Sequence, residues 1–311
     1  MASSSLTAGG RAVAGLVAAA TAILPVFSTP GSALAATHRR ASTPDYCSSS
    51  RNPELAARLS RDLAAALSDR QDTVAFGVWD VETGVSCAYH SSWHFDSASV
   101  VKATIMGAVL RRAEEEHRQL TDWEARNLQP MITASDNTAA LNLWRDLGHF
   151  RLDAFLRLAG MDDTRLGSGD YWGLTQITAA DELKLLDVLT GNPEVLTPAS
   201  REYGLDLMNR VEADQRWGTP FGAPEGISVH VKNGWLPRAT HGWRVHSIGV
   251  FTNESKDYRM AVLTEDNPTE SYGISTIQRI AWAVHHDLNS DTATSGDLDP
   301  QAPELPDDSA P

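Results

Sequence analysis

The chain has 311 residues, the ordinary composition of a globular protein and a formal net charge of −14. Its length allows one large domain or two interleaved ones. The acidic balance argues against nucleic acid as a partner. No second long apolar run follows the one near the N-terminus, so we expect no stable membrane insertion.

The N-terminal segment has the layout of a secretory signal peptide. Arg11 precedes an apolar run over residues 12–26, and a small-x-small site follows at Ala33-Leu34-Ala35. A membrane anchor is the alternative, but the run is shorter than the roughly 20 residues that span a bilayer. We therefore expect residues 1–35 to be removed by cleavage near Ala35, and the mature protein to be secreted.

The C-terminal segment 289–311 has the composition of a disordered tail. Six acidic residues, four prolines and no Lys or Arg fall within residues 290–311. Such a segment buries too little apolar surface to offset the entropy lost on ordering. We interpret it as a solvated end, although a function for it stays open.

Two cysteines occur, Cys47 and Cys87. In an exported protein they can oxidise to each other, which would tie the polar lead-in 36–51 to an early strand. Two separate free thiols are the alternative.

Hydrophobic periodicity and turn signals predict the elements in chain order. Helix signals cover 53–69, 97–116, 139–147, 152–159, 179–189, 199–211 and 270–287, and strand signals cover 73–80, 85–90, 227–232, 243–252 and 258–264. An isolated hairpin cannot bury its own face, so the early and late strands most simply share one sheet. The predicted fold is α+β. A five-stranded antiparallel sheet is flanked by helices in an α/β/α sandwich spanning 52–288, with an all-helical lobe inserted at about 98–217.

The first motif that carries chemistry is Ser99-Val100-Val101-Lys102. Residues three apart on a helix share one face. A serine hydroxyl is a poor nucleophile until a base takes its proton, and a lysine acts as that base only if its pKa is lowered. Such a pair is frequent by chance, so this motif alone proves little.

The second motif, Ser135-Asp136-Asn137, lies at a predicted entry into a helix. Capping of that helix would explain it without any catalysis. In the functional interpretation Ser135 relays a proton to a leaving nitrogen, Asn137 bonds a substrate amide, and Asp136 holds the loop.

The third motif, Lys232-Asn233-Gly234, ends a predicted strand. Lys232 would bring positive charge to a substrate carboxylate, and Gly234 would let substrate backbone lie against the strand edge. The backbone N–H of Trp235 could help to bind an oxyanion. A strand that simply ends in a turn explains the tripeptide equally well.

The ordered triplet resembles the serine β-lactamase and penicillin-binding protein superfamily, most closely class A β-lactamases. The likeness covers about Asn52 to Asp287. It implies that Ser99 is the acylated nucleophile, Lys102 its base, and Ser135 and Lys232 the proton relay and charge anchor.

Three departures from this pattern are visible. Asn233 replaces the usual hydroxyl residue, although its amide can still donate to a carboxylate. Only 36 positions separate Ser99 from Ser135, fewer than is usual in class A enzymes. The omega loop is reduced to residues 167–174, where Asp170 is the only carboxylate. Asp170 is therefore either a substitute for the deacylation base or, more simply, a surface turn residue.

These features predict a secreted serine hydrolase that forms an acyl-enzyme with a β-lactam or a cell-wall peptide-like amide. A D,D-peptidase or transacylase, or a non-catalytic penicillin-binding sensor, is the alternative. Arg244 either binds a substrate carboxylate or is a solvated edge residue. We expect a monomer that needs no cofactor. We also expect no metal site, because the adjacent His285 and His286 face different directions on a helix and no third ligand is evident.

Overall fold

The computed structural model describes residues 45–289, so the predicted signal peptide, most of the lead-in and tail residues 290–311 lie outside the described part. A six-stranded antiparallel sheet in the order β1-β3-β2-β8-β7-β6 forms the centre. Its strands are β1 (Cys47–Ser48), β2 (Thr73–Asp80), β3 (Ser86–Tyr89), β6 (Ser228–Pro237), β7 (Trp243–Thr252) and β8 (Asp257–Asn267). The predicted sheet lacked β1, because a two-residue strand shows no alternation in the sequence.

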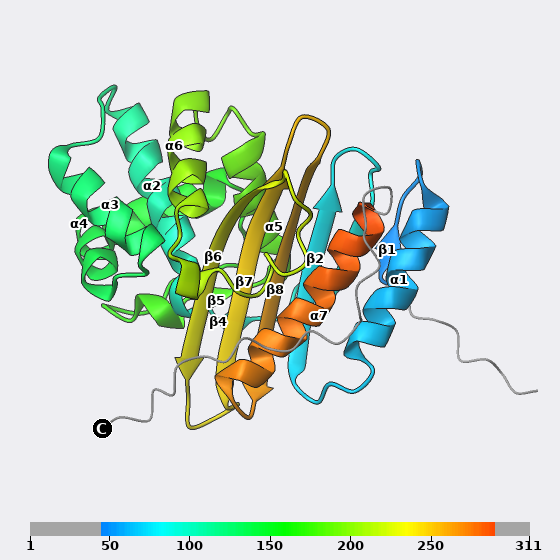
Figure 1. The fold of residues 1–311 in the computed structure, drawn as a ribbon. Coiled ribbons are helices and arrows are strands. Elements are labelled where there is room, and N and C mark those ends of the chain that lie inside the picture. The colour runs from blue at the N-terminus through cyan, green and yellow to red at the C-terminus, as the bar shows by residue number, and fades with distance from the viewer. Residues whose placement is uncertain (1–44, 290–311) are drawn as a thin grey trace, which may run out of the picture. The chain divides into compact units, whose positions relative to one another are not determined.

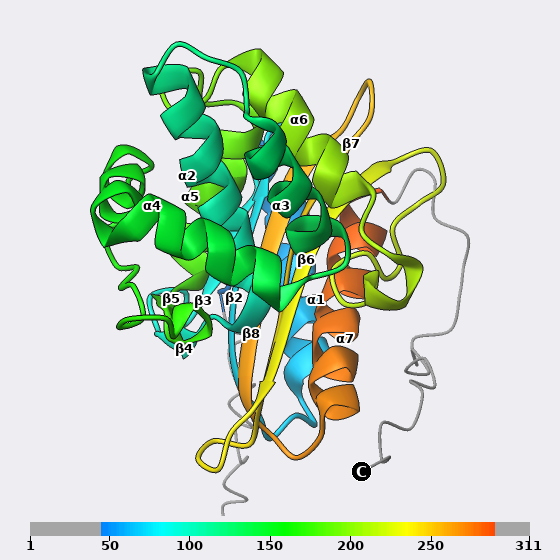
Figure 2. The same ribbon diagram turned by 90° about the vertical axis from the view of Figure 1, so that its left-hand side faces the viewer.

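Helices cover both faces of the sheet (Figures 1 and 2). The helix α1 (Pro53–Leu67) and the last helix α7 (Glu270–Leu288) pack on one face, where they share a hydrophobic core with alternate sheet residues. The other face packs against a helical lobe with its own core. The lobe contains α2 (Val101–Glu115), α3 (Asp122–Thr133), α4 (Asn137–Leu158), α5 (Ala179–Thr190) and α6 (Pro198–Asn209). This arrangement confirms the predicted α+β fold with helices on both sides of the sheet.

Short elements connect the lobe to the sheet. A two-stranded sheet joins β4 (Phe95–Asp96) to β5 (Gln176–Ile177), and single 3₁₀ turns form η1 (Ala98–Val100), η2 (Trp172–Leu174) and η3 (Ala213–Gln215). Helix α4 is interrupted at Gly148, which has a φ of 65° and a ψ of 163°. No helix within residues 45–289 is both long and apolar enough to cross a membrane.

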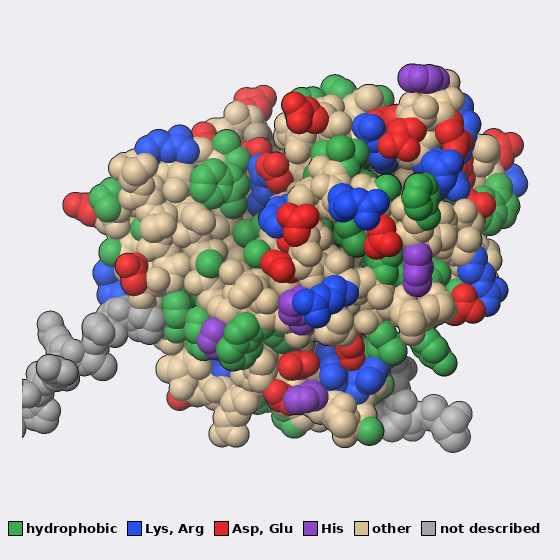
Figure 3. Space-filling view, turned by 180° about the vertical axis from the view of Figure 1, so that it is seen from behind, with side chains coloured by type: hydrophobic (Ala, Val, Ile, Leu, Met, Phe, Trp, Pro, Cys, Tyr) green, Lys and Arg blue, Asp and Glu red, His purple; other side chains and the backbone are tan. Residues whose placement is uncertain are grey.

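Local sequence signals explain where the helices begin. The side chain of Asn52 accepts a hydrogen bond from Leu55 N at 3.1 Å, and Pro53 occupies the first position of α1, as predicted. Thr121 and Glu124 form a reciprocal capping box at the start of α3. On the face seen in Figure 3, acidic and basic side chains are interspersed over the helical lobe.

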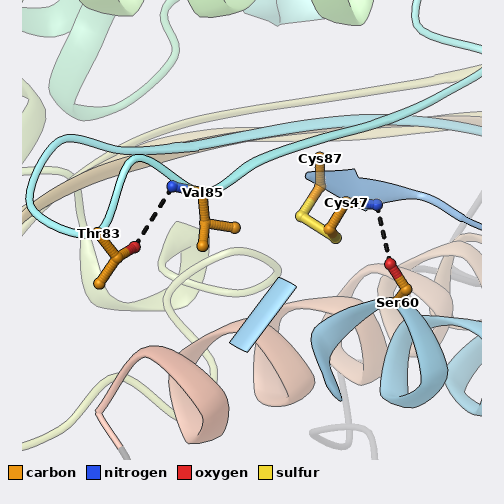
Figure 4. The surroundings of a disulfide bond; sticks show 5 residues. All are labelled: Cys47, Ser60, Thr83, Val85 and Cys87. Carbon is orange, nitrogen blue, oxygen red and sulfur yellow. Dashed lines mark hydrogen bonds between the residues drawn. A yellow bond between two sulfur atoms is a disulfide. The ribbon is translucent and has the colours of Figure 1, made fainter. Parts of the chain in front are cut away.

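Cys47 and Cys87 form a disulfide between directly paired residues of β1 and β3 (Figure 4). Cys47 N also donates to Ser60 Oγ of α1 at 2.9 Å. The bond fixes the end of the lead-in to the sheet edge. In the chain-entropy description, a loop of this length (40 positions) contributes roughly 4 kcal/mol to stability.

Candidate active site

Ser99 lies in the 3₁₀ turn η1, immediately before α2, and its side chain is partly exposed. The preceding residue, Ala98, is buried and has a φ of 46°, a conformation that is costly for a residue with a Cβ. Neighbouring bonds hold the turn: Ser97 N donates to Thr175 O at 2.8 Å, and His246 Nε2 lies 2.8 Å from Asp96 O. The Ser99 hydroxyl makes no hydrogen bond to any described residue, so it is available to a ligand.

Lys102 is fully buried in the second position of α2. Its Nζ donates to Ser135 Oγ at 3.0 Å, to Asn137 Oδ1 at 2.8 Å and to the carbonyl oxygen of Ser135. Burial lowers the pKa of Lys102 to about 7, despite the nearby Asp136 carboxylate. A lysine with this pKa is neutral in a substantial fraction of molecules near neutral pH and can accept a proton.

The Ser135 hydroxyl lies between the two lysines of the site. Its Oγ also accepts from Lys232 Nζ at 3.1 Å, so one hydroxyl lies within hydrogen-bond distance of both buried amines. Ser135 has a positive φ of 54°, and the next residue, Asp136, caps α4 by accepting from Ala139 N at 2.6 Å. Because the oxygen has two lone pairs for the two amines, the single hydrogen of Ser135 remains free to donate elsewhere.

Lys232 is fully buried in β6, and its Nζ also donates to Asn233 O at 2.7 Å. Burial, followed by repulsion from Lys102, lowers the pKa of Lys232 well below its ordinary value. Two amines bonded to one hydroxyl cannot both hold their charge easily in a dry environment. The pair is therefore suited to sharing and moving a proton.

The third motif lies within a strand rather than at its end, because pairing with β7 continues to Pro237. Gly234 packs directly on the nucleophile turn: a Cβ there would lie 2.7 Å from Ser99 N and 2.8 Å from Val100 N. Its missing side chain thus lets β6 approach Ser99, a role the sequence analysis assigned to contact with substrate. Trp235 packs its ring on Trp217, with centroids 5.9 Å apart.

Asn233 and Arg244 both donate hydrogen bonds to backbone carbonyl oxygens, although Arg244 Nε has no hydrogen-bond partner among the described residues. Asn233 is fully buried, and its Nδ2 donates to Gln215 O at 2.8 Å and to Trp217 O at 2.9 Å. The Arg244 side chain is 5% exposed and lies 3.5 Å from Asp96 Oδ2 and 3.7 Å from Glu265 Oε2. This burial contradicts the alternative of a solvated edge residue, whereas binding of a substrate carboxylate by Arg244 stays a prediction.

The short loop 167–174 places Asp170 on the surface. Its carboxylate forms a two-bond ion pair with Arg145 of α4, at 3.0 and 2.5 Å, and its side chain is 53% exposed. This supports the simpler interpretation of Asp170 as a surface turn residue. The same loop instead brings Trp172 to the site, with Lys102 Nζ 4.9 Å from the centre of its ring.

Some site residues carried no usable signal in the sequence. His246 supports the nucleophile turn from β7, 150 positions away from Asp96, and its pKa is lowered to about 4 by burial. His241, Glu265 and Asp266 also come together, with possible ligand atoms within 4.8 Å of one another. His241 Nδ1 already bonds Asp266 Oδ1 at 2.8 Å, and Arg244 balances Glu265, so this cluster has internal partners.

Known proteins resemble this chain in sequence and fold. The family whose model matches is the beta-lactamase enzyme family, over residues 58–123 and 125–288. An ancestral class A β-lactamase is 25% identical, with a TM-score of 0.61 over 73% of this chain and 98% of its own. The structure of PBP-A is 20% identical, with a TM-score of 0.65 over 75% of this chain and 96% of its own, and supports the fold.

A mycobacterial protein is similar over a shorter part of the chain. The protein of Mycobacterium tuberculosis that carries the provisional name lipoprotein LppW is 27% identical over 212 residues, which are 64% of each chain. This chain thus aligns with less than two thirds of that relative. Since the family match covers most of the sequence and the fold agrees with it, the chain belongs to the beta-lactamase enzyme family.

Proposed function

We propose that this protein is an active-site-serine acyl-transfer hydrolase that forms an acyl-enzyme at Ser99 with a β-lactam or a peptide-like amide. The observation that carries the proposal is the convergence at Ser135 Oγ, 3.0 Å from Lys102 Nζ and 3.1 Å from Lys232 Nζ, beside a turn that presents a free serine hydroxyl. Burial of two amines costs desolvation free energy, so this arrangement is more typical of a functional site than of a stabilising contact.

The proposed acylation begins when neutral Lys102 takes the proton of Ser99. The Ser99 Oγ attacks the carbonyl carbon, and the carbon–nitrogen bond of the substrate breaks. Ser135 gives its proton to the leaving nitrogen and regains one from the lysine pair, so protons balance. Asn137 Oδ1 is bonded to Lys102, which leaves the Asn137 amide N–H groups free for the substrate.

Hydrolysis of the acyl-enzyme is proposed to be slow. Among residues 45–289 no carboxylate bonds to Ser99, Lys102 or Ser135, and Asp170 is held by Arg145 on the surface. The Trp172 indole lies at Lys102 instead. Without a base to orient water, the acyl group persists or passes to another acceptor, as in a D,D-peptidase or transacylase.

A penicillin-binding sensor is the second candidate, favoured by the same loop. Intact-mass measurement over time after mixing with benzylpenicillin separates the candidates. A transient adduct indicates turnover and a lasting adduct indicates a peptidase, transacylase or sensor. No adduct with penicillin, peptide or ester substrates would contradict the proposal.

We also propose that the protein acts outside the cytoplasm. The apolar segment at residues 12–26, the Cys47–Cys87 disulfide and the lipoprotein name of the mycobacterial relative support export. Both cysteines of the sequence are used in the disulfide, so neither can carry a lipid anchor. N-terminal sequencing of the secreted protein tests cleavage near Ala35.

A further inference from the structure

We infer that Trp172 determines which acceptor the acyl-enzyme reacts with: its indole covers Lys102 and keeps water away from the acyl group on Ser99. This inference rests on the proposed acylation of Ser99, and it names the residue that selects against water as the acyl acceptor. The absence of a carboxylate from the loop 167–174 and the exclusion of water by a ring are different causes of slow hydrolysis. They predict different behaviour of variants.

The acyl-enzyme still contains a base. In the proposed acylation Lys102 takes the proton of Ser99, and the lysine pair gives a proton back to Ser135 after the leaving nitrogen is protonated, so Lys102 ends neutral. Its pKa of about 7 makes this neutral form accessible. A neutral amine can take a proton from water while the water oxygen attacks the acyl carbon, and Ser99 Oγ then leaves with that proton. The missing loop carboxylate therefore does not by itself prevent hydrolysis.

Two segments of the chain close off the amine of Lys102 from solvent. Its three hydrogen-bond acceptors all come from residues 135–137, at the start of α4. Trp172 comes from the loop, and Lys102 Nζ lies over the face of its ring, 4.9 Å from the centre. A tryptophan donates hydrogen bonds only through Nε1 at the ring edge, so this face offers water no strong hydrogen bond. The Lys102 side chain is fully buried, so solvent does not reach its amine.

Contacts on both sides of Trp172 hold the loop against the nucleophile turn. Thr175 N donates to Trp172 O at 3.1 Å, and Ser97 N of the turn donates to Thr175 O at 2.8 Å. On the other side, Trp144 Nε1 of α4 donates to Gly169 O at 2.8 Å. The Trp172 side chain also packs against the core of the helical lobe. A water molecule that approaches Lys102 from this side would have to displace a packed ring.

Removal of the indole would leave a cavity with a polar wall. A purely apolar cavity can stay dry, whereas a cavity beside an amine gives water a hydrogen-bond partner. One water needs about 30 Å³ of liquid volume, which is less than an indole occupies. Water in this cavity would lie next to Lys102 Nζ, the base of the acyl-enzyme. Loss of the ring should therefore convert a lasting acyl-enzyme into one that is hydrolysed.

The lifetime of the benzylpenicillin adduct tests the inference. Each protein is acylated, freed of excess penicillin and followed by intact mass near neutral pH, and the rate constant of acylation is measured separately. We expect Trp172→Ala to shorten the adduct lifetime at least about tenfold, because a positioned base typically accelerates such a step by about a hundredfold or more. Acylation should change less than about threefold. A merely structural defect would slow acylation and would not accelerate hydrolysis.

Further variants assign the effect to the ring. Trp172→Phe keeps an aromatic ring and should hold the adduct lifetime within about threefold of the wild-type value. Tyr171→Ala is the matched control, because it removes the neighbouring aromatic side chain, which is 67% exposed, and should leave the lifetime unchanged. Trp172→Leu keeps an apolar side chain against the lobe core without a flat ring, so it should also shorten the lifetime if Trp172→Ala folds poorly.

The outcomes separate this inference from the proposed function. A wild-type adduct that is hydrolysed within seconds, or adducts of Trp172→Ala and Trp172→Leu that last as long as the wild-type adduct, would overturn the inference and leave acylation of Ser99 intact. Equal shortening in Tyr171→Ala would overturn it as well, because the ring at Lys102 would then not be the cause. If the wild-type protein forms no adduct with benzylpenicillin and p-nitrophenyl acetate also fails to acylate it, the proposed function itself is wrong.

Discussion

The three-motif site and the loop 167–174 both contact the nucleophile turn. The motifs place buried amines beside it, whereas the loop places an uncharged aromatic ring there. On the motif side, Lys102 and Lys232 are buried at a cost in desolvation and are bonded to Ser135. On the loop side, Trp172 brings an uncharged ring and Asp170 keeps its charge on the surface with Arg145. The groups needed to acylate a serine are present, whereas a carboxylate to activate water is absent from the described contacts.

This difference suggests where selection for chemistry acts. Buried ionisable groups with lowered pKa values are typical of functional sites, so the lysine pair marks the reactive half of the site. The exposed Asp170–Arg145 pair is a contact that any surface tolerates.

Removal of the nucleophile should have the largest effect. We expect Ser99→Ala to abolish labelling by benzylpenicillin, a loss of more than about a thousandfold, while the thermal transition stays nearly unchanged. The Ser99 hydroxyl makes no bond within the described structure, so its loss leaves no unpaired partner. Intact mass and calorimetry check this prediction, and residual labelling would assign the nucleophile to another residue.

The pH dependence of acylation should follow Lys102. With a pKa of about 7, its neutral fraction falls about tenfold between pH 8 and pH 6, so the acylation rate should fall equally. A flat profile over this range would exclude Lys102 as the base. The measurement uses the neutral methyl ester of benzylpenicillin, because that probe does not titrate.

The same burial predicts how stability changes with pH. Since the pKa of Lys232 is lowered on folding, the unfolded chain binds more protons above the folded pKa, and the free energy of unfolding should rise with pH toward about 10. Lys232→Met should remove part of this rise, whereas the control Lys256→Met, which removes a partly exposed lysine bonded to Leu288 O, should keep it. Urea unfolding at pH 7 and pH 9 measures the difference.

Two glycines allow a matched steric comparison of the motif and the loop. A Cβ at Gly234 would lie 2.7 Å from Ser99 N, whereas a Cβ at Gly173 would have no neighbour closer than 3.8 Å. Gly234→Ala should therefore destabilise the protein by about 1–3 kcal/mol and slow acylation about tenfold, because the turn must shift. Gly173→Ala should change both by little. Equal effects would show that the close approach of β6 is unimportant.

The sequence predicted the bounds of elements that show strong periodicity. It did not predict strands whose bounds depend on pairing with residues far away in the chain. The bounds of β2 and β7 match the prediction because alternation and flanking turns mark them. The short β1 and the continuation of β6 past Gly234 depend on pairing with other strands, which a local pattern does not contain.

The site residues also divide into those that the sequence predicted and those whose contacts depend on distant parts of the chain. Spacing brought Ser99 and Lys102 onto one turn, and the family resemblance placed Ser135 and Lys232 beside them. What Asn233 and Arg244 do depends on Gln215, Trp217 and Asp96, which lie up to 148 positions away. Their residue types allow donation to a ligand, and only the structure shows that they also donate to backbone carbonyl oxygens of the protein.

The smallest expected effect tests the loop directly. Asp170→Asn should change the lifetime of the penicillin adduct less than twofold and leave the free energy of unfolding nearly unchanged, because an exposed ion pair contributes little. Arg145→Gln removes the other partner and is the matched control. If Asp170 is only a surface partner, both variants behave alike. An adduct lifetime prolonged tenfold in Asp170→Asn but not in Arg145→Gln would show that this carboxylate reaches the acyl-enzyme, and the contrast between the two halves of the site would then fail.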